Sequence, residues 1–325
     1  MALDWKIFTQ RPYIKSLSLE EQVRLFNIAN EKSIRYRSRS GDGNTGTGPV
    51  LLLDIAGATT DIVGGWSLRK LRSDYTGAPV RVIRTADSAE QDISFTSDGY
   101  IDEDELTTFA DGGSTEVIKW YDQSGTDNHL IPPSVTSRPR TTDGSGNVFK
   151  KGDFLYIQES SRQYFRLTNT LGSSNFGPRS VLALNYFASA TANPRIWYIN
   201  KNAGTRIQQL FLDSSNSHFI TFTNRTTGGV ETNFASTRNV DGDAFNLISS
   251  ILRPSPAETE IYYKGNKIIS ESAIANFDYF LDFNTPEAGS SGNQSDPTEI
   301  VVYSTDQLTN VRVAMENNIN TYYLL

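Results

Sequence analysis

The run Trp-Tyr-Asp-Gln-Ser-Gly, which starts at Trp120, holds the side chains best suited to bind a sugar. Asp122 and Gln123 could hydrogen-bond sugar hydroxyls. The ring of Trp120 or Tyr121 could stack on an apolar sugar face. The same run also fits a turn, in which Asp122 caps the turn, Gly125 takes a positive φ and Tyr121 enters the core. The turn is the interpretation that we favour, and the sugar site stays open beside it.

A second aromatic pair, Trp197 and Tyr198, lies in an apolar run that predicts a strand over residues 195–199. On an inner or concave strand the two rings could form a platform for a sugar. Burial in the core is the commoner fate of such rings.

Metal and thiol chemistry have little support in the composition. The chain has no cysteine and two histidines, His129 and His218, neither with evident metal-ligand neighbours. This excludes disulfides, thiolate zinc sites and thiol nucleophiles. Asp213, Asp241 and Asp243 stand in turn-like contexts, but their spacing matches no calcium-loop signature. We therefore expect no metal site and no cofactor, with calcium as the weaker alternative.

Length, charge and hydropathy narrow the class of protein. The 325 residues carry a net charge of −7 and are 37% hydrophobic, below the roughly 45–50% of average globular chains. Asp4 and Lys6 interrupt the apolar run that a signal peptide needs, and no window of about 18 apolar residues predicts a membrane helix. The sequence thus predicts a protein made in a cytoplasm, without export signal or membrane insertion.

The first 49 residues differ from the remainder and are predicted to be a separate arm. They carry a net charge of +3, which leaves −10 on residues 50–325. A helix is predicted over about residues 19–32, with Leu19, Val23 and Phe26 on its apolar side. That side packs either on its own domain or on a partner. Arg35 and Arg37 belong to a basic stretch that we interpret as a solvated tether rather than a nucleic-acid site, and residues 40–49 are a glycine-rich linker.

From residue 50 onward the pattern predicts an all-β fold. Short runs rich in β-branched and aromatic residues alternate with turn-forming clusters, and a tight hairpin is predicted at residues 263–267. The predicted strands are residues 80–83, 117–121, 180–187, 195–199, 208–212, 219–222, 245–252, 260–263 and 299–303. Many short strands without intervening helices indicate a two-sheet sandwich or jelly roll.

Two helices are predicted inside this all-β region. One covers residues 66–72, and the other closes the chain after Ser304, with a stripe of apolar side chains that would lie over an open edge of the sandwich. The stripe consists of Leu308, Val311, Met315 and Ile319. The acidic run at residues 102–111 predicts a solvated loop or a short helix.

Four elements that follow one another between residues 64 and 130 resemble a known family. They are Ser67-Leu68-Arg69, residues 75–81, Asp92-Ile93 and residues 121–128. Together they resemble the N-terminal part of the catalytic domain of family-54 α-L-arabinofuranosidases, and more closely the same concanavalin-like domain in bacteriophage virion proteins. Residues 297–323 resemble the last strand and closing helix of laminin-G-like jelly rolls. The resemblance implies one concanavalin A-like sandwich over residues 50–325, behind an N-terminal arm of residues 1–49.

The resemblance also implies where catalytic residues would stand, and this chain departs from that pattern. The family's nucleophile is a glutamate on a central strand, and residues 206–211 fit that strand with Gln208 or Gln209 at the critical place. An amide cannot act as the nucleophile. Residues 284–296 contain Glu287 and Asp296 but no copy of the loop that bears the family's acid. The family's vicinal disulfide is also absent. We therefore expect no enzyme activity, with a glycoside hydrolase as the alternative.

Three functions remain open from the sequence. The first is a structural virion protein of a bacteriophage, such as a tail fibre or capsid decoration protein, in which residues 1–49 bind other virion proteins and the sandwich contacts host glycans. Such appendages are commonly trimers, so a homo-oligomer is expected by analogy. The second is a glycoside hydrolase with Glu287 or Asp296 as its acid. The third is a free carbohydrate-binding module.

Overall fold

The computed structural model describes residues 50–159, 163–167, 179–187, 195–201, 205–213, 219–225, 231–254, 257–271, 280–283, 295–306, 309–323 and 325. One compact unit comprises Leu51–Phe95 and Tyr100–Leu325. The predicted arm, with Leu19, Val23, Phe26, Arg35 and Arg37, lies outside the described residues.

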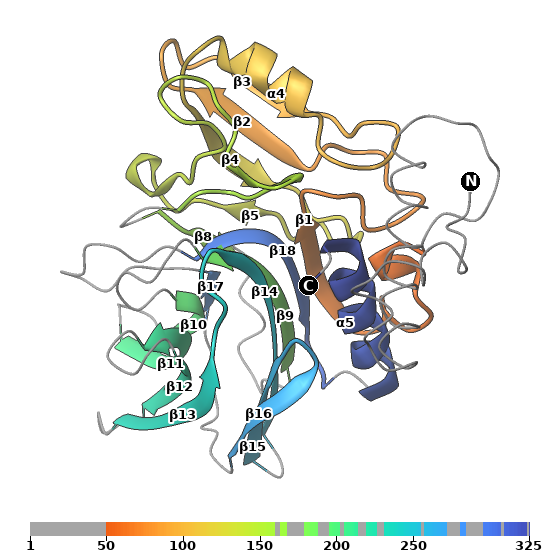
Figure 1. Cartoon of the computed structure of the whole chain (residues 1–325), viewed down its shortest axis with the longest axis vertical. Coiled ribbons are helices and arrows are strands. Elements are labelled where there is room, and N and C mark those ends of the chain that lie inside the picture. The colour runs from red at the N-terminus through yellow and green to blue at the C-terminus, as the bar shows by residue number, and fades with distance from the viewer. Residues whose placement is uncertain are drawn as a thin grey trace, which may run out of the picture. The chain divides into compact units, whose positions relative to one another are not determined.

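Two antiparallel sheets make up most of the described chain (Figure 1). A six-stranded sheet has the order β1-β18-β9-β14-β15-β16, and a ten-stranded sheet has the order β13-β12-β11-β10-β17-β8-β5-β4-β2-β3; β6 and β7 form a separate pair. The strands are β1 (Ile62–Ser67), β2 (Val80–Arg84), β3 (Glu90–Ile93), β4 (Thr115–Trp120), β5 (Leu130–Ile131), β6 (Lys150–Lys151), β7 (Phe154–Leu155), β8 (Phe165–Leu167), β9 (Arg179–Phe187), β10 (Arg195–Lys201), β11 (Thr205–Asp213), β12 (Phe219–Arg225), β13 (Glu231–Asn239), β14 (Ala244–Pro254), β15 (Ala257–Tyr263), β16 (Asn266–Glu271), β17 (Phe280–Phe283) and β18 (Asp296–Tyr303). The short 3-10 helices are η1 (Leu52–Asp54) and η2 (Val135–Ser137).

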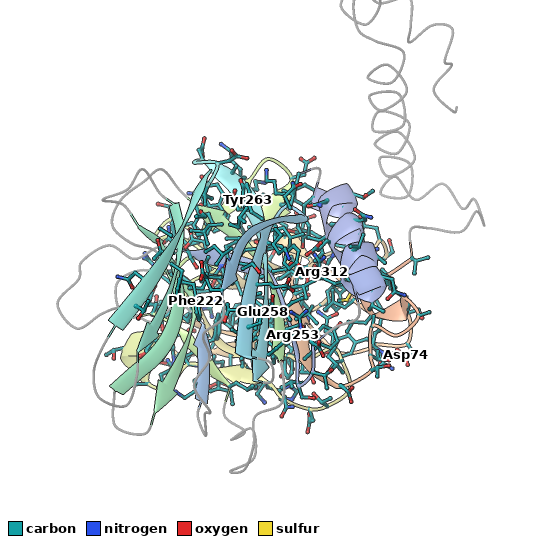
Figure 2. All side chains as sticks on the ribbon, turned by 90° about the horizontal axis from the view of Figure 1, so that it is seen from below. Asp74, Phe222, Arg253, Glu258, Tyr263 and Arg312 are labelled. Carbon is teal, nitrogen blue, oxygen red and sulfur yellow. The ribbon has the colours of Figure 1, made fainter. Side chains whose placement is uncertain are left out.

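The hydrophobic core between the sheets follows from the alternation of side chains along the strands. Val181 and Ala183 of β9 belong to this core together with Leu210 of β11 and Phe222 of β12, each 2% exposed or less. Figure 2 labels Phe222, and Tyr263 of β15, another core residue. Because successive side chains on a strand point to opposite faces, the neighbours of these residues occupy the outer faces. The predicted all-β sandwich is confirmed.

The hairpin predicted at residues 263–267 joins β15 to β16. Tyr263 pairs with Asn266, and the two residues between them have positive φ, 47° at Lys264 and 82° at Gly265. Two positive φ values in a two-residue loop match the twist of the adjoining strands, and glycine favours this backbone conformation. The turn therefore explains the register of this edge of the six-stranded sheet.

Helix α4 (Glu103–Ala110) forms within the acidic run. The Asp102 carboxylate accepts a hydrogen bond from the Glu105 backbone N–H at 2.9 Å, which caps the first turn. Asp111 ends the helix in the left-handed conformation. The run is thus a short helix, one of the two structures predicted for it.

Helix α5 (Thr309–Tyr323) packs on the outer face of the six-stranded sheet. Its Val311, Met315 and Ile319 form a second core with residues such as Leu184 of β9 and Val301 of β18. Figure 1 shows α5 on the side of this sheet away from β10–β13. The predicted closing helix and these three stripe residues are confirmed, and the fourth, Leu308, lies outside the described residues. The expectation that it covers a sandwich edge is wrong, because the alternate residues of β9 and β18 present a complete apolar face.

The helix predicted over residues 66–72 is wrong. Trp66 and Ser67 are the end of β1, and the following residues are irregular. Their backbone groups bond to distant segments: Leu68 N–H donates to the Thr298 carbonyl, and Leu71 N–H donates to the Gln123 side-chain oxygen at 2.8 Å. These long-range bonds replace the i to i−4 bonds of a helix.

Among the described residues, neither α4 nor α5 has the length and apolar character that a membrane-spanning helix needs.

Candidate functional site

Asp122 organises the loop that follows β4. It is 4% exposed, and its Oδ1 accepts hydrogen bonds from the Gly65 and Ser124 backbone N–H groups, both at 2.8 Å. Its Oδ2 accepts from the Ser124 and Thr126 hydroxyls at 2.9 and 2.8 Å, and from the Thr126 and Asn128 N–H groups at 3.1 and 3.2 Å. These bonds use the carboxylate's acceptor capacity within the protein, as the turn interpretation expects.

Gln123 joins the same loop to β1. It is fully buried; its Oε1 accepts from the Leu71 N–H, and its Nε2 donates to the Ser67 carbonyl at 2.8 Å and the Arg69 carbonyl at 3.1 Å. Gly125 has a φ of 93°, and a Cβ there would lie 2.8 Å from the Arg72 guanidinium. The side-chain amide of Gln123 thus satisfies backbone groups of residues 67–71, which have no regular secondary structure after β1. Because the amide is buried, a ligand in solvent cannot reach it.

The two aromatic residues of the run have different environments. Trp120 is fully buried, packed on Phe165 with ring centroids 5.4 Å apart. Tyr121 is half-buried and lies outside the core, so its predicted core position is wrong. Its hydroxyl donates to Asp92 Oδ1 at 2.8 Å, and its ring contacts Lys119 and His129. Burial and then the Asp92 hydrogen bond raise the pKa of Tyr121. Tyr121 is therefore the part of this run that a ligand can reach.

Strand β10 places Trp197 and Tyr198 at the middle of the ten-stranded sheet. The register pairs Trp197 with Leu210, a core residue, and pairs Tyr198 with Gln209 on one side and Asp282 on the other. Directly paired residues share a face. Trp197 thus stands at a core-side position and Tyr198 at an outer position; their side chains lie outside the described part of the structure.

A row of outer positions crosses this sheet through Tyr198. The pairs join Asn233 of β13, Thr223 of β12, Gln209 of β11, Tyr198 of β10, Asp282 of β17 and Arg166 of β8. We call these six positions the outer row. Leu210 and Phe222, the strand neighbours of two of its members, are in the core, so the row lies on the opposite face. Strands lie about 4.8 Å apart, so the row spans about 24 Å.

Four positions of the outer row were not predicted from the sequence: Arg166, Thr223, Asn233 and Asp282. The alternation of apolar and polar residues over 220–223 is a signal that marks Thr223 as an outer residue. It does not show which strands pair, because the row joins segments from residue 166 to residue 282 through register alone. The row brings Tyr198 to Gln209, one of the two glutamines predicted at the nucleophile position.

The acidic residues proposed as an alternative catalytic acid are not equivalent. Glu287 lies outside the described residues. Asp296 is 1% exposed, and its Oδ1 accepts from the Glu159 N–H at 2.9 Å. Burial raises the pKa of Asp296 to about 8, which suits a proton donor, but the same burial separates its carboxyl from solvent. The described geometry therefore offers no accessible acid at this position.

Ion pairs occupy two of the aspartates considered for calcium. Asp241 bonds to Lys264 at 2.8 Å, and Asp243 bonds to Lys151 at 2.6 Å. Asp213 lies at the end of β11, with its side chain outside the described residues. Among the residues that the structure describes, no group of three or more His, Asp or Glu side chains could hold a metal ion.

The chain is similar to known proteins in its overall fold and, at the sequence level, in one segment. Residues 54–152 match the family model described as the catalytic domain of α-L-arabinofuranosidase B. No curated protein sequence shows significant similarity to the chain.

Solved structures of arabinofuranosidases are similar over most of this chain. A family-54 α-L-arabinofuranosidase soaked with a cyclic sulfate inhibitor has a TM-score of 0.62 at 15% identity, covering 85% of this chain and 66% of its own. A glutamate-to-glutamine mutant of such an enzyme, soaked with 4-nitrophenyl α-L-arabinofuranoside, has a TM-score of 0.64 at 15% identity with the same coverage.

An arabinofuranosidase complexed with arabinofuranosyl-α-1,2-xylobiose has a TM-score of 0.61 at 17% identity, covering 85% of this chain and 65% of its own. This chain therefore spans just under two thirds of the length of these relatives. At such identities the likeness shows the fold: the chain is a β-sandwich of the architecture found in family-54 α-L-arabinofuranosidases.

Proposed function

We propose that this chain binds carbohydrate without hydrolysing it, and that the sugar lies along the outer row of the ten-stranded sheet. The observation that carries the proposal is the register that aligns Asn233, Thr223, Gln209 and Tyr198 on one face. Amides, hydroxyls and an aromatic residue are the groups that hydrogen-bond sugar hydroxyls and stack on sugar rings. A row of about 24 Å has room for several sugar units.

The absence of hydrolysis follows from the chemistry of the row. Retaining glycosidases need two carboxyl groups about 5–5.5 Å apart, one as nucleophile and one as acid. Gln208 and Gln209 occupy β11, where the family resemblance calls for the nucleophile, and a carboxamide does not form a glycosyl ester. The fold shared with arabinofuranosidases supports arabinose-containing glycans as the first ligands to test.

Binding is expected to depend on one face of β13. Arabino-oligosaccharides and host surface polysaccharides should bind the wild type in calorimetric titration, and Asn233→Ala should weaken binding about tenfold, the effect of one lost hydrogen bond. Thr232→Ala is the matched control, because Thr232 is the exposed neighbour on the other face and its loss should leave affinity unchanged. If both variants bind like the wild type, the row is not the site; if no glycan binds, the proposed function fails.

Hydrolysis is tested on the same samples. With 4-nitrophenyl α-L-arabinofuranoside and with the bound polysaccharides, we expect no release of nitrophenol or of reducing sugar. Release that persists in proportion to protein concentration would establish the glycoside hydrolase instead.

We also propose that the chain is a bacteriophage virion protein whose residues 1–49 attach it to other virion proteins, as a homo-oligomer. The support is the resemblance of residues 64–130 to the concanavalin-like domain of phage virion proteins, together with the opposite charge of the arm and the sandwich. Deletion of residues 1–49 should leave the melting temperature of the sandwich unchanged and remove the protein from purified particles. Particles that keep their full content of the truncated protein would refute the attachment role.

A further inference from the structure

The residue pairing that defines the outer row continues beyond β8 to the edge of the ten-stranded sheet. After β8 the strand order is β5, β4, β2 and β3, and Figure 1 shows these strands one after another. Each adds one position to the line, and these positions are Ile131, Lys119, Arg81 and Asp92. We call these four positions the charged row. With strands about 4.8 Å apart, the outer row and the charged row together span about 43 Å.

The charged row lies on the outer face of the sheet. Leu130 of β5 pairs with Trp120 of β4, and both are fully buried in the core. Because side chains alternate along a strand, their neighbours Ile131 and Lys119 face outward, and antiparallel pairing places these two opposite each other. Both are half-buried, so a ligand on this face can reach them.

A β-bulge in β4 sets the direction of Lys119. The pairing of β4 with β2 skips Ile118, which is an extra residue of β4. The extra residue lets Val117 and Trp120, three positions apart, both enter the core, while Lys119 faces outward. Bulges are common beside functional sites, where they re-aim a side chain.

The charge of Lys119 is not compensated by a neighbouring carboxylate. Lys119 forms no ion pair with any residue that the structure describes. Its paired neighbours are the apolar Ile131 and a second cation, Arg81. The Arg81 guanidinium does have carboxylate partners, since its Nε lies 3.0 Å from Glu90 Oε2 and its Nη1 lies 3.4 Å from Asp92 Oδ2. An uncompensated cation therefore stands on this face, although residues 50–325 carry a net charge of −10.

Tyr121 holds the Lys119 ammonium in position. The Lys119 Nζ lies 5.2 Å from the centroid of the Tyr121 ring, a cation–π contact. The ring is itself fixed, because its hydroxyl donates to Asp92 Oδ1 at 2.8 Å and the His129 ring meets it edge-on with centroids 5.1 Å apart. A cation–π contact occupies no N–H donor in a hydrogen bond, so the ammonium keeps its donors for a ligand.

We propose that the charged row extends the sugar site and binds an anionic sugar unit, whose carboxylate accepts hydrogen bonds from Lys119. This inference rests on the proposed binding of carbohydrate along the outer row. Charge-assisted hydrogen bonds from an ammonium to a carboxylate are stronger than neutral ones. Ile131, between Arg166 and Lys119 in the register, offers an apolar contact to the C–H face of the sugar ring. A polysaccharide of uronic acids supplies hydroxyls to the outer row and a carboxylate to Lys119.

The first measurement compares charged and neutral oligosaccharides on the wild type. In calorimetric titration, oligogalacturonate should bind about fivefold more tightly than its uncharged methyl ester, which is the effect of one accessible ion pair. High salt should reduce this preference by screening the charges. A sulfated galactan oligosaccharide carries the same sign of charge, and tighter binding of this ligand than of oligogalacturonate would overturn the assignment to a carboxylate.

The second measurement assigns the preference to one side chain. Lys119→Gln should abolish the fivefold preference for oligogalacturonate and leave the affinity for the methyl ester unchanged, whereas Lys119→Arg, which keeps the charge, should retain it. Lys264→Gln is the matched control. It removes the same charge from the β15–β16 hairpin of the other sheet, so the preference should persist.

The outcomes separate this inference from the proposed function. If the wild type binds neutral glycans but does not prefer oligogalacturonate to its ester, the charged row is refuted and carbohydrate binding stands. Equal losses of preference in Lys119→Gln and Lys264→Gln would reveal a general effect of net charge and would also refute the charged row. If no glycan binds the wild type, the proposed function fails, and this inference fails with it.

Discussion

Asp122→Ala is expected to lower the free energy of unfolding by about 3–5 kcal/mol, the range for loss of a buried network. The substitution removes both oxygens of a carboxylate that accepts from four backbone N–H groups and two hydroxyls. Its partner Gly65 belongs to β1, 57 residues away, so the effect is not confined to the loop. Urea unfolding followed by tryptophan fluorescence measures the change.

Two further variants distinguish the stability effect of the Asp122 carboxylate from that of any other substitution in the same loop. Asp122→Asn keeps the shape but turns an NH₂ toward hydrogen-bond donors, so a loss of about 1–3 kcal/mol is expected. Asp127→Asn is the control: Asp127 is in the same loop, 90% exposed, and pairs with His129, so its loss should cost less than about 1 kcal/mol. If Asp122→Ala costs no more than Asp127→Asn, Asp122 does not organise the loop.

Strands such as β9 and β14 were predictable from the sequence because their side chains satisfy a local rule, whereas β1, β3, β13 and β17 were not among the predicted runs. The runs at 180–187 and 245–252 are rich in β-branched and apolar residues, and β9 and β14 extend them by only one or two residues at their ends. The hairpin at Lys264-Gly265 was predictable for the same reason, since the turn needs positive φ at adjacent residues.

Residues 66–72 were mispredicted because their structure depends on partners far away in the sequence. Leu68 and Leu71 are three residues apart, which is a helical spacing, but Leu68 lies in the core between the sheets and Leu71 in the core under α5. Gln123 supplies the hydrogen bonds that a helix would have made internally. Gln123 was singled out in the sequence as a possible sugar ligand. Periodicity does not predict that its hydrogen-bond partners lie in residues 67–71.

In the candidate site, too, single residues were predictable from the sequence and their long-range neighbours were not. Tyr198 and the glutamines of β11 were identified from residue type and family resemblance. Their alignment with Asn233 and Asp282 depends on which strands are neighbours, and β17 inserts between β8 and β10 although it follows them by about 80 residues or more. Register between distant strands therefore determines the outer row, and no single segment of sequence contains it.

Arg69→Met is expected to lower the free energy of unfolding by about 3–5 kcal/mol, because it leaves the Glu299 carboxylate buried without its cation. The two side chains are 2% and 1% exposed, with Nε and Oε2 at 2.6 Å, and a second bond joins Arg69 Nη2 to Glu299 Oε1 at 2.8 Å. Burial alone would lower the pKa of Arg69, but the charge and hydrogen bonds of Glu299 outweigh burial, so the pKa lies above its usual value. The guanidinium thus stays charged, and its removal unbalances the site.

The same arginine fastens α5 to the sheet. Its Nη2 donates to Asn318 Oδ1 at 3.0 Å, and its guanidinium carbon lies 4.3 Å from the centroid of the Tyr322 ring. Arg69→Met should therefore also increase hydrogen exchange in the last turns of α5, beyond the change in the β14–β15 hairpin. Arg81→Met is the surface control: Arg81 pairs with Glu90 at 3.0 Å, but both are about two-fifths exposed, so a much smaller loss than that of Arg69→Met is expected.

A double-mutant cycle distinguishes a coupled pair from two independent contacts. Glu299→Gln removes the charge that Arg69 compensates while keeping acceptors for the Ser67 and Tyr323 hydroxyls. If the charges are coupled, the double variant Arg69→Met with Glu299→Gln should lose about 2 kcal/mol less unfolding free energy than the sum of the two single variants. Each single variant leaves one buried charge without its partner, and the double variant leaves none. Additive losses would show that Arg69 acts through its packing on Tyr322 and Asn318, and that the ion pair does not hold α5 to β18.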